Sequence, residues 1–166
     1  MSMSEKIIIN GNLKELHSSG FEVKDGEPDI RGWKVKNDKD QSIGKVDELL
    51  FDTQSLRVRY LVLDLDGKPL NLVSRKVIIP IGLVALDTKE DLVFLPEVTV
   101  AHLATLPEYK KGKVTIETER EIRKVFEPAE GLRISDPDYY DPQEFYNNRY
   151  FDDQKMYERR RGNPRL

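Results

Sequence analysis

Few side chains in this sequence have the types and spacing that catalysis or metal binding would require. The chain has two histidines and no cysteine, so it offers no thiolate, and neither His17 nor His102 has a partner at metal-ligand spacing. It also lacks a Gly-x-Ser-x-Gly elbow and a phosphate-binding glycine loop. The remaining candidates for an enzyme are the carboxylates of Asp47, Glu48, Asp52 and Asp64. Acidic residues beside strand ends are usually solvated, and we therefore expect no catalytic, cofactor-binding or metal-binding residues.

One stretch of the sequence resembles the start of a calcium-binding loop. The residues from Asp64 read Asp-Leu-Asp-Gly, as the start of an EF-hand loop can. Such a loop places oxygen ligands at alternate positions and closes with a glutamate about twelve residues along. Lys68, Leu70 and Leu72 occupy the later ligand positions, so the spacing argues against calcium binding.

Aromatic and charged side chains at the C-terminal end indicate binding rather than catalysis. Residues 129–166 contain five of the seven tyrosines and two of the six phenylalanines. Residues 130–153 hold seven acids and two arginines, whereas residues 154–166 hold five basic residues and one glutamate. Tyr, Phe and Arg are enriched at protein interfaces. The candidate interaction residues are Tyr139, Tyr140, Phe145, Tyr146, Tyr150, Phe151, Tyr157, Arg159, Arg160 and Arg161.

Three strands joined by two tight turns are predicted between Gly32 and Leu65. Apolar and polar residues alternate around Trp33, and the polar run 37–40 then predicts a turn. In the next run, residues 43–51, the alternation slips by one position at Gly44, which indicates a bulge or a sharp bend. The third run, from residue 57, becomes apolar on both faces in its second half, so we expect another element to cover it.

Further strands and two short helices are predicted after this unit. Residues 77–81 form a fourth strand, in which Pro80 fits only an edge or a bulge, and the runs 83–86 and 92–95 predict a closing hairpin. Thr99 is predicted to cap a short helix that carries Ala101, Leu103 and Leu106. The pattern Thr118-x-x-Glu121 is a capping box ahead of an apolar stripe at Ile122, Val125 and Phe126. The expected shared core includes Trp33, Val46, Leu50, Val62, Ile79 and Phe94.

The order of these motifs resembles the PRC-barrel family. The motifs are Gly-Trp-x-Val, Ile-Gly-x-Val-x-x-Leu-Leu-x-Asp, Val-Arg-Tyr-Leu-Val-Leu-Asp and Val-Ile-Ile-Pro-Ile. The resemblance covers about Pro28 to Leu106 and is most distinctive between Glu27 and Trp33. The family is named for the cytoplasmic domain of the photosynthetic reaction centre H subunit, and a related barrel forms the C-terminal half of a ribosome maturation factor. The resemblance implies a small, highly bent antiparallel β-barrel with a structural or docking role and no enzymatic reaction.

We therefore expect a mainly β protein of one domain with short C-terminal helices and an extended tail, since 166 residues is a one-domain length. The predicted division is an N-terminal extension (1–27), a PRC-barrel domain (28–106), a helical segment (107–128) and an aromatic, charge-polarised tail (129–166). No signal peptide is evident, and no apolar run approaches the roughly 20 residues of a membrane span. The expected location is the cytoplasm.

Three classes of function remain open. We expect a non-enzymatic protein-interaction or assembly module that self-associates as a dimer or larger, with residues 136–157 taking part, although these residues could instead rest on their own barrel. The alternative is an RNA- or ribosome-associated factor, which the Arg159–Arg161 cluster favours. The net charge of −3 opposes specific nucleic-acid binding, because phosphate contacts usually need a basic face. An enzyme would depend on the carboxylates named above.

Overall fold

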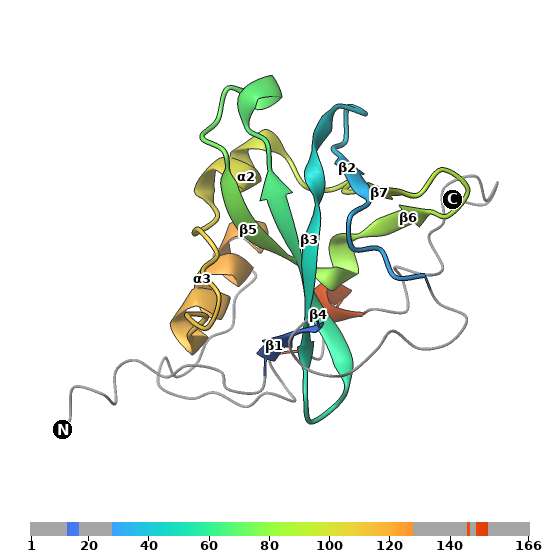
Figure 1. The fold of residues 1–166 in the computed structure, drawn as a ribbon. Coiled ribbons are helices and arrows are strands. Elements are labelled where there is room, and N and C mark those ends of the chain that lie inside the picture. Colours follow the sequence, from blue (N-terminus) through green and yellow to red (C-terminus); the bar gives the residue numbers. More distant parts are fainter. Residues whose placement is uncertain (1–12, 17–27, 128–145, 147–148, 153–166) are drawn as a thin grey trace.

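The computed structural model describes residues 13–16, 28–127, 146 and 149–152 (Figure 1). Its strands are β1 (Leu13–Glu15), β2 (Lys34–Lys36), β3 (Ser42–Asp52), β4 (Arg57–Leu65), β5 (Arg75–Pro80), β6 (Ala85–Asp87) and β7 (Leu92–Phe94). Its helices are α2 (Val100–Thr105) and α3 (Ile116–Phe126), and its short 3-10 turns are η2 (Lys68–Leu70), η3 (Ile81–Leu83) and η5 (Arg149–Phe151). Within these ranges, no helix is long and apolar enough to cross a membrane.

The strands form one bent sheet in the order β5-β4-β3-β2-β7-β6, and β1 pairs with the end of β3. All pairs are antiparallel except β2 and β7, which run parallel. Hydrogen bonds do not close the sheet within the described ranges, because β5 and β6 remain its two ends. The mainly β, highly bent fold that the sequence predicts is confirmed. The sequence predicts an antiparallel sheet and does not predict the parallel pair. In this pair β7 lies along the edge of β2 that β3 leaves free.

Irregular pairing along β3 bends the sheet. Val35 pairs with Gly44 and Lys36 pairs with Ser42, so Ile43 has no partner on β2. Gly44 has a φ of 145°, and a Cβ there would overlap the carbonyl oxygen of Asp64 on β4. The prediction of a bulge at Gly44 is confirmed, and the close approach of β4 requires glycine there.

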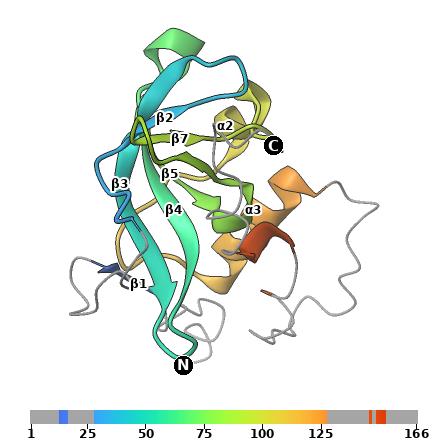
Figure 2. The ribbon, with the colours of Figure 1, turned by 90° about the vertical axis from the view of Figure 1, so that its right-hand side faces the viewer.

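The core lies between the sheet and the elements that cover β4. The centre of β4, from Tyr60 to Leu63, is buried on both faces, as its apolar sequence predicts. Figure 2 shows α3 and η5 on the same side of this strand. The core contains Val46, Leu50, Val62 and Ile79, with Trp33 partly buried against it.

Phe94 departs from the core that the sequence predicts. Its side chain is buried, but it lies outside the main cluster, which contains its neighbours Val93 and Leu95. Successive side chains of a strand point to opposite faces. Val93 therefore lies on the core face of β7 and Phe94 on the other face.

The predicted edge strand and closing hairpin are also found. Pro80 is the last residue of β5, which is an end strand of the sheet. The backbone N–H of Tyr109 donates to the carbonyl of Lys76 at 2.7 Å, so the chain after α2 covers part of that edge. β6 and β7 pair as a hairpin, and the Asp87 carboxylate accepts backbone N–H groups from the turn that follows it.

The two helices begin at threonines, one of them earlier than the sequence suggests. Thr99 caps α2 as predicted, and His102 completes the capping box by accepting from the Thr99 N–H. α3 is capped by Thr115, while Thr118 bonds back to the cap from its third helical position. The prediction that Thr118 is the cap is therefore wrong, because Thr115 supplies the same chemistry one turn earlier. The stripe of Ile122, Val125 and Phe126 packs against the core as expected.

Candidate functional site

Three of the ten candidate interaction residues lie within the described ranges, and all three are buried on the chain's own barrel. The side chains of Tyr146, Tyr150 and Phe151 are 5%, 9% and 4% exposed. We call residue 146 together with residues 149–152 the C-terminal anchor. We call the surface that it contacts on β4, η3 and α3 the anchor site. Outside the described ranges lie Tyr139, Tyr140, Phe145, Tyr157, Arg159, Arg160 and Arg161.

A buried glutamate on α3 is the polar centre of the anchor site. Glu119 and Ile122 are three positions apart, so they share the helix face that is turned toward the barrel. Glu119 is fully buried, and its Oε1 accepts the hydroxyl of Tyr60 at 2.9 Å and that of Tyr146 at 2.6 Å. Burial of a carboxylate is tolerated only where donors replace water. Glu119 therefore connects α3, the barrel and the anchor.

Aromatic rings surround this polar centre. The ring of Phe151 meets the ring of Tyr60 edge-to-face at 5.3 Å between centroids, and the ring of Tyr146 at 4.9 Å. Edge-to-face pairs of this kind contribute about 0.5–1.5 kcal/mol each beyond the area that they bury. Phe151 thus packs between Tyr60 of β4 and Tyr146 of the anchor itself.

The guanidinium of Arg59 lies over the face of the Tyr146 ring. Its guanidinium carbon lies 4.2 Å from the ring centroid, and its Nη2 donates to Ser55 at 3.1 Å and lies 3.8 Å from a carboxylate oxygen of Asp52. The pairing of β3 with β4 skips Arg59. This bulge places Arg59 beside Tyr60, so that both side chains reach the anchor. A desolvated cation–π contact contributes on the order of 2 kcal/mol.

The backbone of the anchor lies directly on a glycine of η3. A Cβ at Gly82 would overlap the carbonyl oxygen of Arg149 and the carbonyl carbon of Tyr150. Glycine is therefore required at position 82, because the backbone of the anchor leaves no room for a Cβ atom there. Beside this contact the Arg149 guanidinium bonds Glu97 at 3.0 Å, and the Tyr150 hydroxyl donates to the carbonyl of Phe126 at 3.3 Å.

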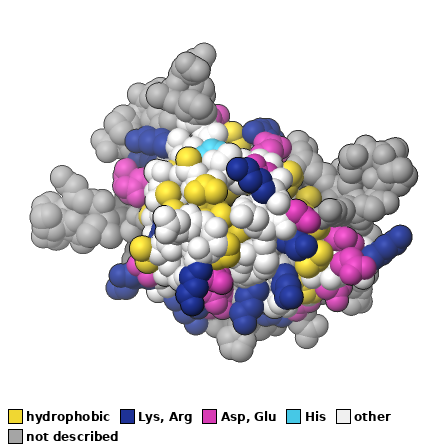
Figure 3. All heavy atoms as spheres, turned by 90° about the horizontal axis from the view of Figure 1, so that it is seen from above, with side chains coloured by type: hydrophobic (Ala, Val, Ile, Leu, Met, Phe, Trp, Pro, Cys, Tyr) yellow, Lys and Arg dark blue, Asp and Glu magenta, His cyan; other side chains and the backbone are white. Residues whose placement is uncertain are grey.

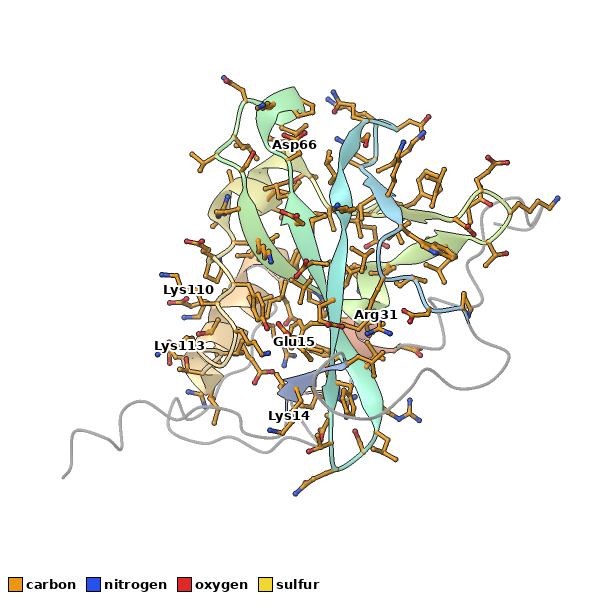
Figure 4. The ribbon with its side chains drawn as sticks, in the orientation of Figure 1. Lys14, Glu15, Arg31, Asp66, Lys110 and Lys113 are labelled. Carbon is orange, nitrogen blue, oxygen red and sulfur yellow. The ribbon has the colours of Figure 1, made fainter. Side chains whose placement is uncertain are left out.

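Polar contacts also lie around β1 and around the residues that precede β2. The Tyr109 hydroxyl donates to Glu15 at 2.7 Å, and burial, followed by the bond to Glu15, raises the pKa of Tyr109. Arg31 forks onto Asp29, and this bond lowers the pKa of Asp29. In Figure 4 Glu15 and Arg31 flank β3. The Tyr109–Glu15 bond ties β1 to the chain after α2, whereas the Asp29–Arg31 bond is local to the residues before β2.

The carboxylates that the sequence offers for catalysis make separate structural contacts. Asp47 binds Lys76 at 3.1 Å, Glu48 is buried and accepts the N–H of Leu49, and Asp52 accepts backbone N–H groups of the following turn. Asp64 lies within β4 in register with Lys45 and Lys76. No group of three or more acidic or histidine side chains that could hold a metal occurs in the described part of the chain.

One of the two histidines, His102, lies within the described ranges. His17 lies outside the described ranges. His102 is partly buried, its Nδ1 accepts the backbone N–H of Thr99 at 3.0 Å, and its ring packs on Phe126 at 4.7 Å. Burial lowers the pKa of His102. It is a helix cap rather than a free surface side chain.

Comparison with protein families identifies the barrel. Residues 25–100 match the family model of the PRC-barrel domain, and the matched part contains β2 to β7. The chain contains a PRC-barrel domain. The PRC-barrel domain supplies Arg59, Tyr60 and Gly82 to the anchor site, whereas Glu119 and the anchor itself lie beyond the matched residues. No curated protein matches the chain.

Sequence reasoning found the aromatic anchor but missed most of its site. The concentration of tyrosine and phenylalanine points to Tyr146 and Phe151. Glu119 is missed, because a glutamate near a helix start is ordinarily read as a solvated residue that favours the helix dipole. A signal was present, since Glu119 shares the apolar stripe of Ile122. Gly82 could not be connected with Arg149 from the sequence, because their contact spans 67 residues.

Proposed function

We propose that this PRC-barrel protein is a non-enzymatic protein-interaction module whose barrel binds an aromatic peptide segment. The observation that carries the proposal is the burial of Tyr146, Tyr150 and Phe151 on a surface fitted to them. The fit includes a glycine against the segment's backbone and a carboxylate that accepts the Tyr146 hydroxyl.

The chemistry of the anchor supports a binding role. Interface hot spots are rich in Tyr and Arg, and their aromatic side chains fill desolvated pockets. The anchor combines tyrosines, Phe151 and Arg149. The site offers the Arg59 cation to the Tyr146 ring and the Glu119 carboxylate to the Tyr146 hydroxyl. A surface that is fitted to one such segment can recognise the same segment on another molecule.

Surface charge favours a protein partner over RNA. Figure 3 shows Lys and Arg side chains interspersed with Asp and Glu around one face of the molecule, with hydrophobic side chains near its middle. RNA- and DNA-binding proteins usually carry clustered positive charge. The mixed distribution on this face, together with the net charge of −3, supports the protein-interaction proposal.

A labelled peptide tests the proposal directly. The full-length variant Tyr146→Ala/Phe151→Ala has a disabled anchor, and a fluorescent peptide of residues 143–153 is titrated into it while anisotropy is measured. We expect saturable binding. The matched peptide with Phe151→Ala should bind at least about ten-fold more weakly, because burial of a phenylalanine contributes about 1.5–3 kcal/mol. Equal binding of both peptides, or none to the folded variant, would contradict the proposal.

Self-association is part of the same proposal. Light scattering of the wild-type chain at tens of micromolar is expected to give a dimer or a larger assembly. Removal of the residues after 128 should reduce the assembly, because the anchor leaves with them. A full-length chain that is monomeric under these conditions would remove self-association from the proposal and leave the peptide-binding role to the titration.

A further inference from the structure

We propose that two copies of the chain exchange their C-terminal anchors, so that each PRC barrel binds the anchor of its partner. This inference rests on the proposed function and names the partner as a second copy. It commits the anchor site to one occupant, the segment that carries Tyr146, Arg149 and Phe151.

The contacts of the anchor that lie within the described ranges are made with residues far earlier in the chain. They include contacts with Arg59, Tyr60, Gly82, Glu97, Glu119 and Phe126, all of which come before residue 128. Each contact can therefore form with equal geometry between one copy's anchor and another copy's barrel.

The intervening chain is long enough to permit exchange. Residues 128–145 place 18 residues between Glu127 and Tyr146, and a chain of that length reaches at most about 60–65 Å when extended. Within one chain, however, the Tyr150 hydroxyl touches the end of α3 at Phe126. Within one chain, the connection from Glu127 to Tyr146 therefore needs to span only a short distance. In an exchanged pair, the rest of its length is available to reach the barrel of the second chain.

Two copies are sufficient for a complete exchange of anchors. Each chain has one anchor and one anchor site, so reciprocal exchange about a two-fold axis fills both sites and leaves neither anchor free. Two-fold symmetry of this kind is the commonest arrangement of soluble homo-oligomers. The same reciprocity lets the acidic stretch of one tail meet the basic stretch of the other, which sets the direction of pairing.

Competition from the chain's own anchor determines how exchange must be tested. The 18 residues between Glu127 and Tyr146 tie the anchor to its own barrel, so the chain's own anchor competes with that of a partner for each site. Exchange therefore becomes visible at lower concentration when internal binding is disabled. Two complementary full-length variants achieve this. Gly82→Ala blocks the site and keeps the anchor, whereas Tyr146→Ala/Phe151→Ala disables the anchor and keeps the site.

Mixing the two variants gives the decisive measurement. At about 50 µM each variant alone should be monomeric, and an equimolar mixture should show a heterodimer of twice the chain mass by light scattering. The control replaces the first variant with Gly82→Ala/Tyr146→Ala/Phe151→Ala, which has neither a site nor an anchor and should give no heterodimer. Circular dichroism establishes that each variant is folded.

A crosslinking measurement keeps the proposal testable if Gly82→Ala does not fold. The chain has no cysteine, so the exposed ion pair can be replaced by Glu97→Cys and Arg149→Cys and joined with a bifunctional maleimide. Exchange gives a covalent dimer on a denaturing gel, whereas internal binding gives a crosslinked monomer. Either single substitution serves as the control for random collision.

The outcomes separate this inference from the proposed function. A heterodimer, or a covalent dimer that the single-thiol controls do not form, supports exchange. If neither forms while the labelled peptide binds the anchor-deficient variant, exchange is wrong and the peptide-binding role stands. If the peptide also fails to bind, both proposals are wrong.

Discussion

Removal of the Tyr146 hydroxyl tests whether Glu119 holds the anchor on the barrel. The substitution Tyr146→Phe keeps the ring, its edge-to-face contact with Phe151 and its cation–π contact with Arg59. It removes only the hydroxyl that donates to the buried Glu119 carboxylate at 2.6 Å. The perturbation therefore tests this hydrogen bond while the ring contacts of residue 146 stay in place.

The size of the effect follows from the burial of the acceptor. Hydrogen bonds to charged groups contribute about 1.5–3 kcal/mol, and Glu119 is fully buried, so water cannot replace the lost donor. In a protein of this size each kcal/mol lowers the melting temperature by about 2–4 °C. We expect Tyr146→Phe to lower the free energy of unfolding by about 1.5–3 kcal/mol and the melting temperature by about 3–12 °C.

Urea denaturation of two matched variants measures this effect. Tyr150→Phe is the control, because it removes a hydroxyl from the same segment, but one that donates to a neutral backbone carbonyl at 3.3 Å. Its expected loss is about 0.5–1.5 kcal/mol. If Tyr146→Phe leaves the midpoint unchanged, or shifts it no more than Tyr150→Phe does, the assignment of Glu119 as the centre of the site is refuted.

Three further perturbations test the barrel and a helix cap. Val62→Ala should lower the free energy of unfolding by about 2 kcal/mol in denaturant titrations, because it leaves a cavity in the core. Gly44→Ala should destabilise the protein more than Gly112→Ala in thermal unfolding, since both have positive φ but only Gly44 lies against another strand's backbone. Burial lowers the pKa of His102 below its ordinary 6.5, so the stability that its neutral form confers should be complete above about pH 6.5 and be lost as the pH falls through the lowered pKa. Unfolding midpoints measured from pH 7.5 to 5 should flatten in His102→Gln, which keeps an acceptor for the cap, and an unchanged slope would contradict this origin.

The barrel was largely predictable because its signals are local. Alternation of apolar residues, the polar turn at 37–40 and the slip at Gly44 each depend on a few neighbouring residues. The parallel contact of β2 with β7 was not predictable, since alternation gives the face of a strand but not the direction of its neighbour. The start of α3 was misplaced because Thr115 and Thr118 offer the same capping chemistry three residues apart.

The anchor site was predictable only on one side. Aromatic composition identifies Tyr146 and Phe151 as binding residues without saying whether they bind their own barrel. Their partners are hidden for a physical reason. Glu119 is polar and Gly82 has no side chain, so neither carries an apolar signal, and both acquire their role only through contacts between distant parts of the sequence.

Folding during synthesis must wait for β7, because β7 fills the second edge of β2. Leu92 to Phe94 pair with Lys34 to Lys36, a sequence separation of 58 residues, and such non-local pairings form slowly. Until they form, a nascent chain whose first hairpins have folded exposes β2 as an unpaired edge that other chains can extend. Substitutions that weaken β7 are therefore expected to lower the soluble yield at high expression more than they lower the stability of the folded protein.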